Sequence, residues 1–226
     1  MPVEKIVDRR ARASAVLERL AEVYPEARSA LDYADAFGFL IAVILSAQTT
    51  DRAVNQVTGE LFLRWPDARA LASAEVDEVA QVIQTIGIYR VKARRIVEAA
   101  QCLVVDFDGR VPGTMAELLR LPGVGRKTAN VVLAEIFDRA EGIAVDTHVY
   151  RIAHRLKLVG GSANTPEKVE RALMSVFRVE QYNRVNRYLV LFGREVCIAR
   201  RARCEVCPLS DLCPSASRRE GLSGSG

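Results

Sequence analysis

The sequence contains little of what would mark several other classes of protein. Of its 226 residues only 6% are aromatic and two are histidines, and residues 143–145 form too short a strand signal to count. The longest apolar run, 37–45, is interrupted by Gly38 and is far too short to span a membrane. No apolar segment follows the charged N-terminal residues, so there is no secretory signal. These absences predict an intracellular protein whose thiols stay reduced.

Neither sign of charge dominates the sequence. There are 32 Lys and Arg against 28 Asp and Glu, and the net charge is +4. This balance permits a nucleic-acid partner, but binding would require the basic residues to gather in one patch. Half of the residues are hydrophobic, which predicts a globular protein with a substantial core.

What is present is helical periodicity. Apolar residues recur at the i, i+3, i+4, i+7 spacing in four stripes, and a fifth segment is apolar all round, as expected of a buried central helix. The four stripes cover residues 13–24, 54–65, 76–86 and 93–107, and the fifth segment is 37–46. Thr114 with Glu117, and Thr165 before Pro166, are typical helix starts, and Gly193 is interpreted as a helix stop. The predicted class is all-α.

Residues 121–129, Leu-Pro-Gly-Val-Gly-Arg-Lys-Thr-Ala, predict a tight hairpin between two helices. Gly123 and Gly125 permit positive φ and the close approach of another backbone. The second helix would begin near Arg126 with free amides and a positive dipole end, which binds phosphate. Lys127 lies in its first turn. That helix end, Arg126 and partial burial all disfavour an ammonium, and a neutral amine can attack carbon to form a Schiff base.

Asp146 precedes another helical stretch, where either Asp146 or Thr147 is suited to cap the helix. A carboxylate at a helix start stays ionised. It can stabilise a sugar cation and help to deprotonate a nucleophile.

Four of the five cysteines lie close together as C-x6-C-x2-C-x5-C, at Cys197, Cys204, Cys207 and Cys213. Four thiolates without histidine suit a tetrahedral zinc site or an iron–sulfur cluster, and the spacing alone leaves both open. Three arginines, Arg200, Arg201 and Arg203, lie between the first two cysteines and predict a compact phosphate-binding surface. Cys102 is on the apolar face of a helix and is interpreted as a core residue.

The hairpin, the Lys127–Asp146 pair and the cysteine spacing together resemble the endonuclease III family of helix–hairpin–helix DNA glycosylases, over about residues 10–214. The resemblance implies that Lys127 attacks C1′ of a damaged nucleotide while Asp146 helps the base to leave. β-Elimination from the Schiff base then nicks the strand. It also implies a structural [4Fe–4S] cluster on the four cysteines and a substrate of oxidised pyrimidines.

Further DNA contacts follow from the same resemblance. Gly123, Gly125 and Arg126 would bind the backbone, and His148 would lie at the DNA interface. Base-flipping enzymes fill the gap left in the stack, a role that falls to Gln48 in Leu-Ser-Ala-Gln and to Ile88 in Ile-Gly-Ile-Tyr. Arg90 and Val91 depart from the small polar pair common there, which puts opposite-base preference in doubt.

The family fold implies two all-α domains with DNA in the cleft between them. A six-helix domain with the hairpin would span 29–140, and the cluster domain would combine 1–28 with 141–214. Residues 215–226, rich in serine, glycine and charge, predict a disordered tail. The partner would be double-stranded DNA with damaged bases or abasic sites. The protein is expected to be a monomer in a bacterial cytoplasm, associated with the nucleoid and without membrane contact.

Two other interpretations remain. An adenine-mismatch glycosylase of the same superfamily would lack the lysine at position 127 and carry an extra C-terminal domain. A non-catalytic iron–sulfur protein that binds DNA or transfers electrons would leave the Lys127–Asp146 pair unexplained. Nicking of abasic DNA discriminates between these interpretations.

Overall fold

The computed structural model describes residues 4–216, and in this range all regular structure is helical, without a β-strand. The predicted all-α class is confirmed. The helices are α1 (Ile6–Val23), α2 (Ala36–Leu45), α3 (Asp51–Arg64), α4 (Ala68–Ala72), α5 (Val76–Val82), α6 (Tyr89–Phe107), α7 (Met115–Leu118), α8 (Arg126–Ile136), α9 (Thr147–Arg155), α10 (Pro166–Val176) and α11 (Tyr182–Glu195), with short 3-10 turns at Val179–Gln181 and Cys204–Val206. None of these helices is long and apolar enough to cross a membrane.

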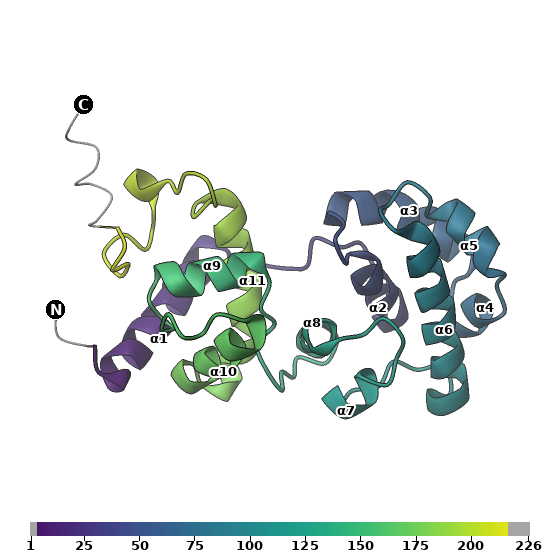
Figure 1. The fold of residues 1–226 in the computed structure, drawn as a ribbon, viewed down its shortest axis with the longest axis horizontal. Coiled ribbons are helices and arrows are strands. Elements are labelled where there is room, and N and C mark those ends of the chain that lie inside the picture. Colours follow the sequence, from purple (N-terminus) through teal and green to yellow (C-terminus); the bar gives the residue numbers. More distant parts are fainter. Residues whose placement is uncertain (1–3, 217–226) are drawn as a thin grey trace. The chain divides into compact units, whose positions relative to one another are not determined.

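The chain divides into two compact units. Unit 1 combines residues 1–28 with 140–226, and unit 2 is the continuous segment 29–139. Each unit has its own cluster of buried apolar residues. Figure 1 shows the helices that make up each unit.

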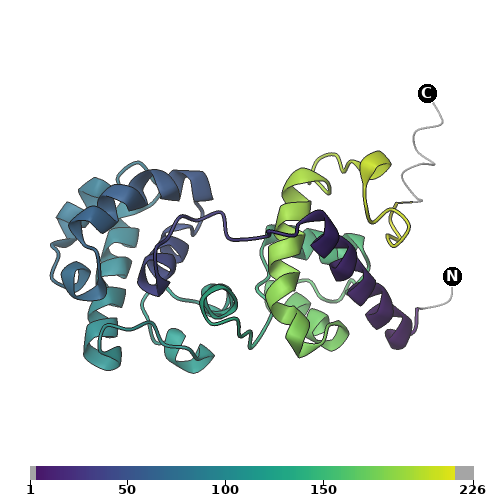
Figure 2. The same cartoon turned by 180° about the vertical axis from the view of Figure 1, so that it is seen from behind.

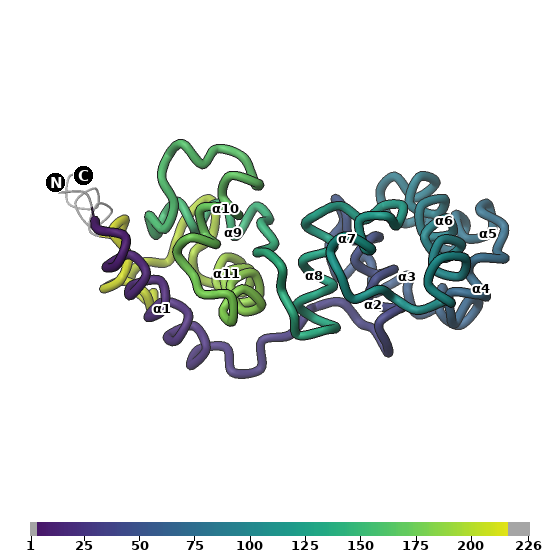
Figure 3. Tube along the Cα trace, turned by 90° about the horizontal axis from the view of Figure 1, so that it is seen from below, coloured from purple at the N-terminus to yellow at the C-terminus, as the bar shows by residue number. Residues whose placement is uncertain are grey.

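Unit 2 is built around α2. Every residue of α2 from Phe37 to Leu45 is buried, because the helix packs against α3, α6 and α8. The long helix α6 packs against α4 and α5 as well, and α7 packs against α8; Figure 3 shows this group from below. The all-apolar sequence of α2 therefore reflects its central position, as expected from its composition.

Unit 1 brings the N-terminal helix together with the C-terminal half of the chain. Helix α1 packs against α10 and α11, and α9 packs against the same two helices, as the view from behind in Figure 2 illustrates. The buried stripe of α1 is Ala13, Val16, Leu17 and Leu20, which agrees with the sequence pattern. A helix from one end of the chain thus supports the segment that carries the cysteines at the other.

Helix boundaries follow local chemistry at most of the predicted places. The Thr114 side chain accepts a hydrogen bond from the Glu117 amide, and Thr165 caps α10 with Pro166 in its first turn. Tyr24 ends α1 directly before Pro25. The stripe at 76–86 was expected to be one helix, but α5 ends at Val82, and Ile83 and Ile86 are buried in the turn that follows.

Gly193 was expected to end a helix, and that prediction is wrong. α11 continues to Glu195, and Gly193 is buried inside it, facing α9. A Cβ at this position would lie 2.8 Å from His148 Nδ1 and 2.9 Å from Ile152 Cδ1. The glycine is therefore required by the close approach of two helices rather than by a helix end.

The end of the described chain is packed rather than free. Ser215 Oγ donates to the Arg155 carbonyl at 2.6 Å, and Ala216 is buried. These are the first two residues of the tail expected at 215–226. Residues 217–226 of that expected tail lie outside the described residues.

Candidate functional site

The hairpin of unit 2 has the predicted helix–turn–helix form. Leu121 and Val124 are buried and anchor it, and the Val124 amide donates to the Leu121 carbonyl at 3.1 Å. Gly123 has φ +81°, and a Cβ there would lie 3.1 Å from Ile44 Cγ2 and 3.3 Å from Arg95 Cβ. Gly123 is thus demanded both by its backbone conformation and by its neighbours.

Gly125 has a different role from Gly123. Its backbone is extended, with φ −97°, and a Cβ there would meet nothing within 4 Å, so no contact inside the described chain requires glycine. Gly125 is the N-cap of α8, and no side chain among the described residues caps that helix. The first amides of a helix lack intrahelical partners, and with open space beside Gly125 they are accessible to an anion.

Arg126 and Lys127 open α8, and both side chains are exposed. The partial burial expected for Lys127 is therefore absent. Its position in the first turn, next to Arg126 and the positive helix end, is as predicted. Exposure gives the amine access to a macromolecular substrate, whereas burial would have withdrawn it.

Asp146 is the N-cap of α9 in unit 1, and of the two capping candidates it is the one that acts. Its Oδ1 accepts a hydrogen bond from the Val149 amide at 2.8 Å, and the residue is half-buried. Within the described chain this is the hydrogen bond that its carboxylate accepts. The other oxygen, Oδ2, is therefore available to a ligand.

His148 is held by an arginine of its own helix. Nη2 of Arg151 lies 3.2 Å from His148 Nδ1 and donates to the carbonyls of Gly193 at 3.0 Å and Cys197 at 3.1 Å. One guanidinium therefore connects the histidine with the end of α11 and with the first cysteine. Gly193 makes this contact possible, since a side chain there would overlap the histidine ring.

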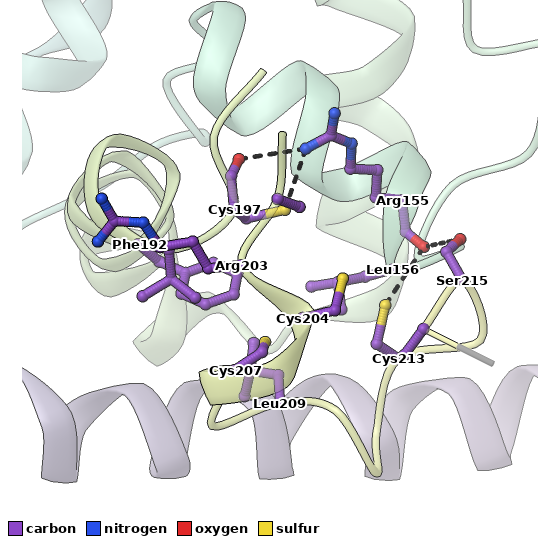
Figure 4. A pocket seen from close by; sticks show the side chains of 13 residues that line it. Arg155, Leu156, Phe192, Cys197, Arg203, Cys204, Cys207, Leu209, Cys213 and Ser215 are labelled. Atoms are coloured by element: carbon purple, nitrogen blue, oxygen red, sulfur yellow. Dashed lines mark hydrogen bonds between the residues drawn. The ribbon is translucent and has the colours of Figure 1, made fainter. Parts of the chain in front are cut away.

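Arg155, one helical turn after Arg151, fixes the segment that follows α11. It donates to the carbonyls of Cys197, Ile198 and Ala199 at 3.2, 2.8 and 2.8 Å, and to Cys197 Sγ at 3.3 Å. Its own carbonyl accepts from Ser215 Oγ and lies 3.8 Å from Cys213 Sγ. A single residue of α9 thus binds both ends of the cysteine-containing segment (Figure 4).

The four cysteines of the C-terminal segment line one pocket, together with apolar side chains such as Leu156, Phe192 and Leu209 (Figure 4). Burial raises the pKa of the Cys207 thiol, and the three other cysteines raise it further, while a backbone hydrogen bond from Leu209 opposes the rise. A cation would offset both effects, so the donor set fits a metal or cluster that binds thiolates. Within residues 4–216, however, no three His, Cys, Asp or Glu side chains converge closely enough to hold a single ion.

Arg200, Arg201 and Arg203 are exposed on this segment, directly after the carbonyls that Arg155 fixes. Their backbone is held and all three residues are exposed, and Arg203 also lines the cysteine pocket. This is the arrangement expected of a surface that binds phosphates.

Gln48 and Ile88 share an uncommon backbone conformation. Both lie in the left-handed region, with φ 55° and 51°, and both are exposed, Ile88 by 51%. For a residue with a side chain this conformation costs about 1–2 kcal/mol, and it is most costly for a β-branched one such as isoleucine. Gln48 lies beyond the end of α2, whose C-cap is Ser46, so it is not a helix cap. Asp108, Asp138 and Lys157 also have positive φ, so the strain supports a functional role for Gln48 and Ile88 only together with their place in the two predicted insertion segments.

Lys92 is a residue of this region that the sequence analysis missed. It lies in the first turn of α6, is only 1% exposed, and its Nζ donates to Thr49 Oγ1. The available signal was its register, because Lys92 falls at the i, i+4, i+7 spacing with the buried Ile96 and Ala99. Cys102, by contrast, is half-buried rather than in the core, and its thiol lies 3.5 Å from Asp106 Oδ2.

Comparison with known proteins agrees with this geometry. Residues 41–179 match the model of the HhH-GPD superfamily base excision DNA repair proteins. Endonuclease III of Synechocystis is 44% identical over 214 residues, which cover 95% of this chain and 97% of that protein. The chain belongs to the endonuclease III family. Its function is accordingly that of a DNA glycosylase in base excision repair, in the class of glycosylase/AP-lyase enzymes.

Other members of the endonuclease III family give the same result. The Escherichia coli K12 protein is 40% identical and covers 90% of this chain and 95% of its own length. A structure described as a trapped endonuclease III–DNA covalent intermediate superposes with a TM-score of 0.85 at 37% identity, covering 93% of this chain and 98% of its own. A non-covalent endonuclease III–DNA complex also gives 0.85, covering 94% and 98%. The family carries a [4Fe–4S] cluster, and the resemblance predicted from the sequence is confirmed.

Proposed function

We propose that this protein removes oxidised or ring-saturated pyrimidines from double-stranded DNA and then cleaves the abasic site by β-elimination through Lys127. The observation that carries the proposal is the first turn of α8. There an exposed primary amine, that of Lys127, lies in the first turn after the N-cap Gly125, which is beside open space. The amides can bind a backbone phosphate while the amine reaches the sugar of the same strand. The related endonuclease III structures contain DNA, which supports DNA as the partner.

The proposed reaction begins with the lone pair of Lys127 Nζ. It attacks C1′ of the damaged nucleotide, and the glycosidic bond breaks with its electron pair leaving on the base, which takes up a proton. The nitrogen passes one proton to a base, the C1′–O4′ bond breaks with its electron pair on O4′, which takes up a proton, and the C=N bond of a protonated Schiff base forms. Removal of a proton from C2′ then expels the 3′ phosphate oxygen, which breaks the strand.

Asp146 supplies the negative charge that this reaction needs. An ionised carboxylate stabilises the positive charge that develops on the sugar and can accept a proton from the nucleophile. The Val149 amide binds Oδ1 and holds the carboxylate in place, so that Oδ2 acts on the substrate. Mutations of Asp146 therefore affect both α9 and the reaction.

Cys197, Cys204, Cys207 and Cys213 would hold the [4Fe–4S] cluster. Support comes from their shared pocket, its apolar lining and the Arg155 hydrogen bond to Cys197 Sγ, since donors to the ligating sulfurs are typical of such sites. The cluster would be structural. It would close the segment whose backbone Arg155 already holds and keep Arg200, Arg201 and Arg203 on one surface.

The three arginines should contribute affinity without base specificity. We expect the Arg200→Ala, Arg201→Ala, Arg203→Ala triple variant to lose affinity for damaged and undamaged duplex by about the same factor, because phosphates carry no sequence information. Each lost phosphate contact should reduce the slope of log affinity against log salt by about 1. Fluorescence anisotropy across a salt series measures both quantities. Wild-type affinity at every salt concentration would place these arginines outside the DNA interface.

The substrate class has its own test. A saturated pyrimidine is not planar and stacks poorly, so turning it out of the helix costs less than the few kcal/mol of a normal base. We therefore expect single-turnover cleavage of duplexes with thymine glycol to exceed that with 8-oxoguanine opposite cytosine, or adenine opposite 8-oxoguanine, by about tenfold or more. Gln48→Ala should slow the thymine glycol reaction more than nicking at a preformed abasic site. Preference for the mispaired adenine would refute this substrate class and place the protein in the adenine glycosylase branch.

A further inference from the structure

Lys92 is an uncommon residue because it is a buried lysine that has no carboxylate partner within residues 4–216. Its side chain is 1% exposed, and within the described chain its ammonium donates to a neutral acceptor, Thr49 Oγ1. Burial lowers the pKa of Lys92, as expected when a charged form is desolvated. An apolar side chain of similar length would avoid this cost. The lysine therefore requires a reason other than packing.

The reason lies in what Lys92 connects. Its backbone amide donates to the Ile88 carbonyl at 3.1 Å, so it lies directly beneath the strained residue that begins α6. Its side chain ends at Thr49, the residue that follows the strained Gln48. The Thr49 amide donates to the carbonyl of Ser46, the C-cap of α2, at 3.0 Å, so Thr49 is itself bound to the end of α2. One side chain therefore joins the segment 46–50 to the start of α6.

The two segments share a further property. Gln48 and Ile88 are exposed, distant in sequence and in the left-handed region, and residues in that conformation relax unless their surroundings hold them. Neither is a glycine, so the conformation is unfavourable for each on its own. Sites that act on a ligand need supports of this kind, since their geometry must be set before binding.

We propose that Lys92 is a positioning residue that holds the segments carrying Gln48 and Ile88 in one fixed arrangement through its hydrogen bond to Thr49. The inference rests on the proposed function, together with the role that the family resemblance implies for Gln48 and Ile88, which is to fill the gap that the damaged base leaves in the stack. Lys92 itself does not touch DNA. Without its hydrogen bond each segment relaxes separately, and the two insertions no longer occur together.

The first test requires no DNA. Lys92→Met keeps an unbranched apolar stem and removes the donor, and Thr49→Val keeps the shape of its partner and removes the acceptor. In either variant, amide hydrogen exchange of peptides covering residues 46–50 and 86–89 should be about tenfold faster, the effect of losing a hydrogen bond to a charged group. Exchange elsewhere in α2 and α6 should be unchanged. Lys168→Met, which removes an exposed lysine of α10, is the matched control and should exchange as the wild type does.

The second test measures what the positioning is for. Both variants should excise thymine glycol about tenfold more slowly in single turnover, and nick preformed abasic sites at nearly the wild-type rate. In a Gln48→Ala background the added Lys92→Met change should cost little more, because the residue being positioned is already gone. If Lys92 had a merely structural role, its substitution would slow both excision and nicking, and by the same factor in the wild type and in the Gln48→Ala variant.

The outcomes separate the two claims. Unchanged exchange in both segments overturns the inference, whatever the enzyme does. Faster exchange with unchanged excision makes Lys92 structural only and also overturns it. If Gln48→Ala excises thymine glycol as fast as the wild type, the insertion role in the proposed function fails, and the positioning role fails with it. Should Lys92→Met not fold, Thr49→Val, which changes a half-exposed residue, carries both tests.

Discussion

A Lys127→Gln variant is expected to lose covalent trapping on abasic-site DNA in the presence of borohydride, and to retain binding to the same duplex. Glutamine preserves much of the length and polarity of the side chain, but its amide nitrogen is not a nucleophile. The hairpin would be unaffected, because Lys127 is exposed and the fold of the hairpin depends on Leu121, Val124 and Gly123. Cleavage should fall by on the order of a thousandfold or more, as when other catalytic nucleophiles are removed.

The matched control is Lys168→Gln, which removes an exposed lysine that hydrogen-bonds Asn164 on the surface of unit 1. It should trap and nick as the wild type does. Trapping is resolved by denaturing gel electrophoresis, and binding by anisotropy without borohydride. Crosslinking that persists in Lys127→Gln would mean that another amine attacks the sugar. Loss of binding together with trapping would mean that position 127 serves affinity rather than chemistry.

Helix positions could be predicted from the sequence where they depend on the spacing of apolar residues along one face of the helix or on a capping side chain. The stripe of α1 and the continuous burial of α2 follow from apolar spacing, and Thr114 and Thr165 begin helices because their side chains accept amide hydrogen bonds there. The end of α11 could not be predicted in this way. Gly193 is typical of a helix stop, but the need for glycine comes from His148, which lies next to it in space although it is distant in sequence. Local pattern carries no information about such a contact.

The same limit applies to the candidate site. The types and spacing of residues indicated the hairpin, the N-cap aspartate and the thiols in one pocket, since each of these depends on neighbours in sequence. The exposure of Lys127 and the burial of Lys92 depend on packing between helices. Lys127 was expected to be partly buried, and Lys92 was not identified from the sequence. The left-handed backbone of Gln48 and Ile88 has no sequence signal either, because neither residue type favours it.

The second large effect concerns the cysteines. We expect the protein, purified without oxygen, to be brown and to contain four irons per chain, and Cys207→Ser to lose most of that iron. Thermal unfolding of Cys207→Ser should begin about 10 °C lower or more, as expected when a structural metal site worth several kcal/mol is lost. Elemental analysis and calorimetry measure the two quantities.

The cause of this loss lies in the small amount of regular structure in residues 197–216. Leu209 and Ala216 are buried there, Arg155 fixes the two ends, and Arg19 of α1 binds the Pro208 carbonyl and Asp211, but the regular structure is limited to a short 3-10 turn at Cys204–Val206. Cys102→Ser is the matched control. It removes a thiol of α6 in unit 2 that lies beside Asp106 and outside the pocket, so iron content should not change. Stoichiometric zinc in place of iron would refute the cluster assignment, since four thiolates bind either metal, and iron in Cys207→Ser equal to the wild type would exclude this thiol as a ligand.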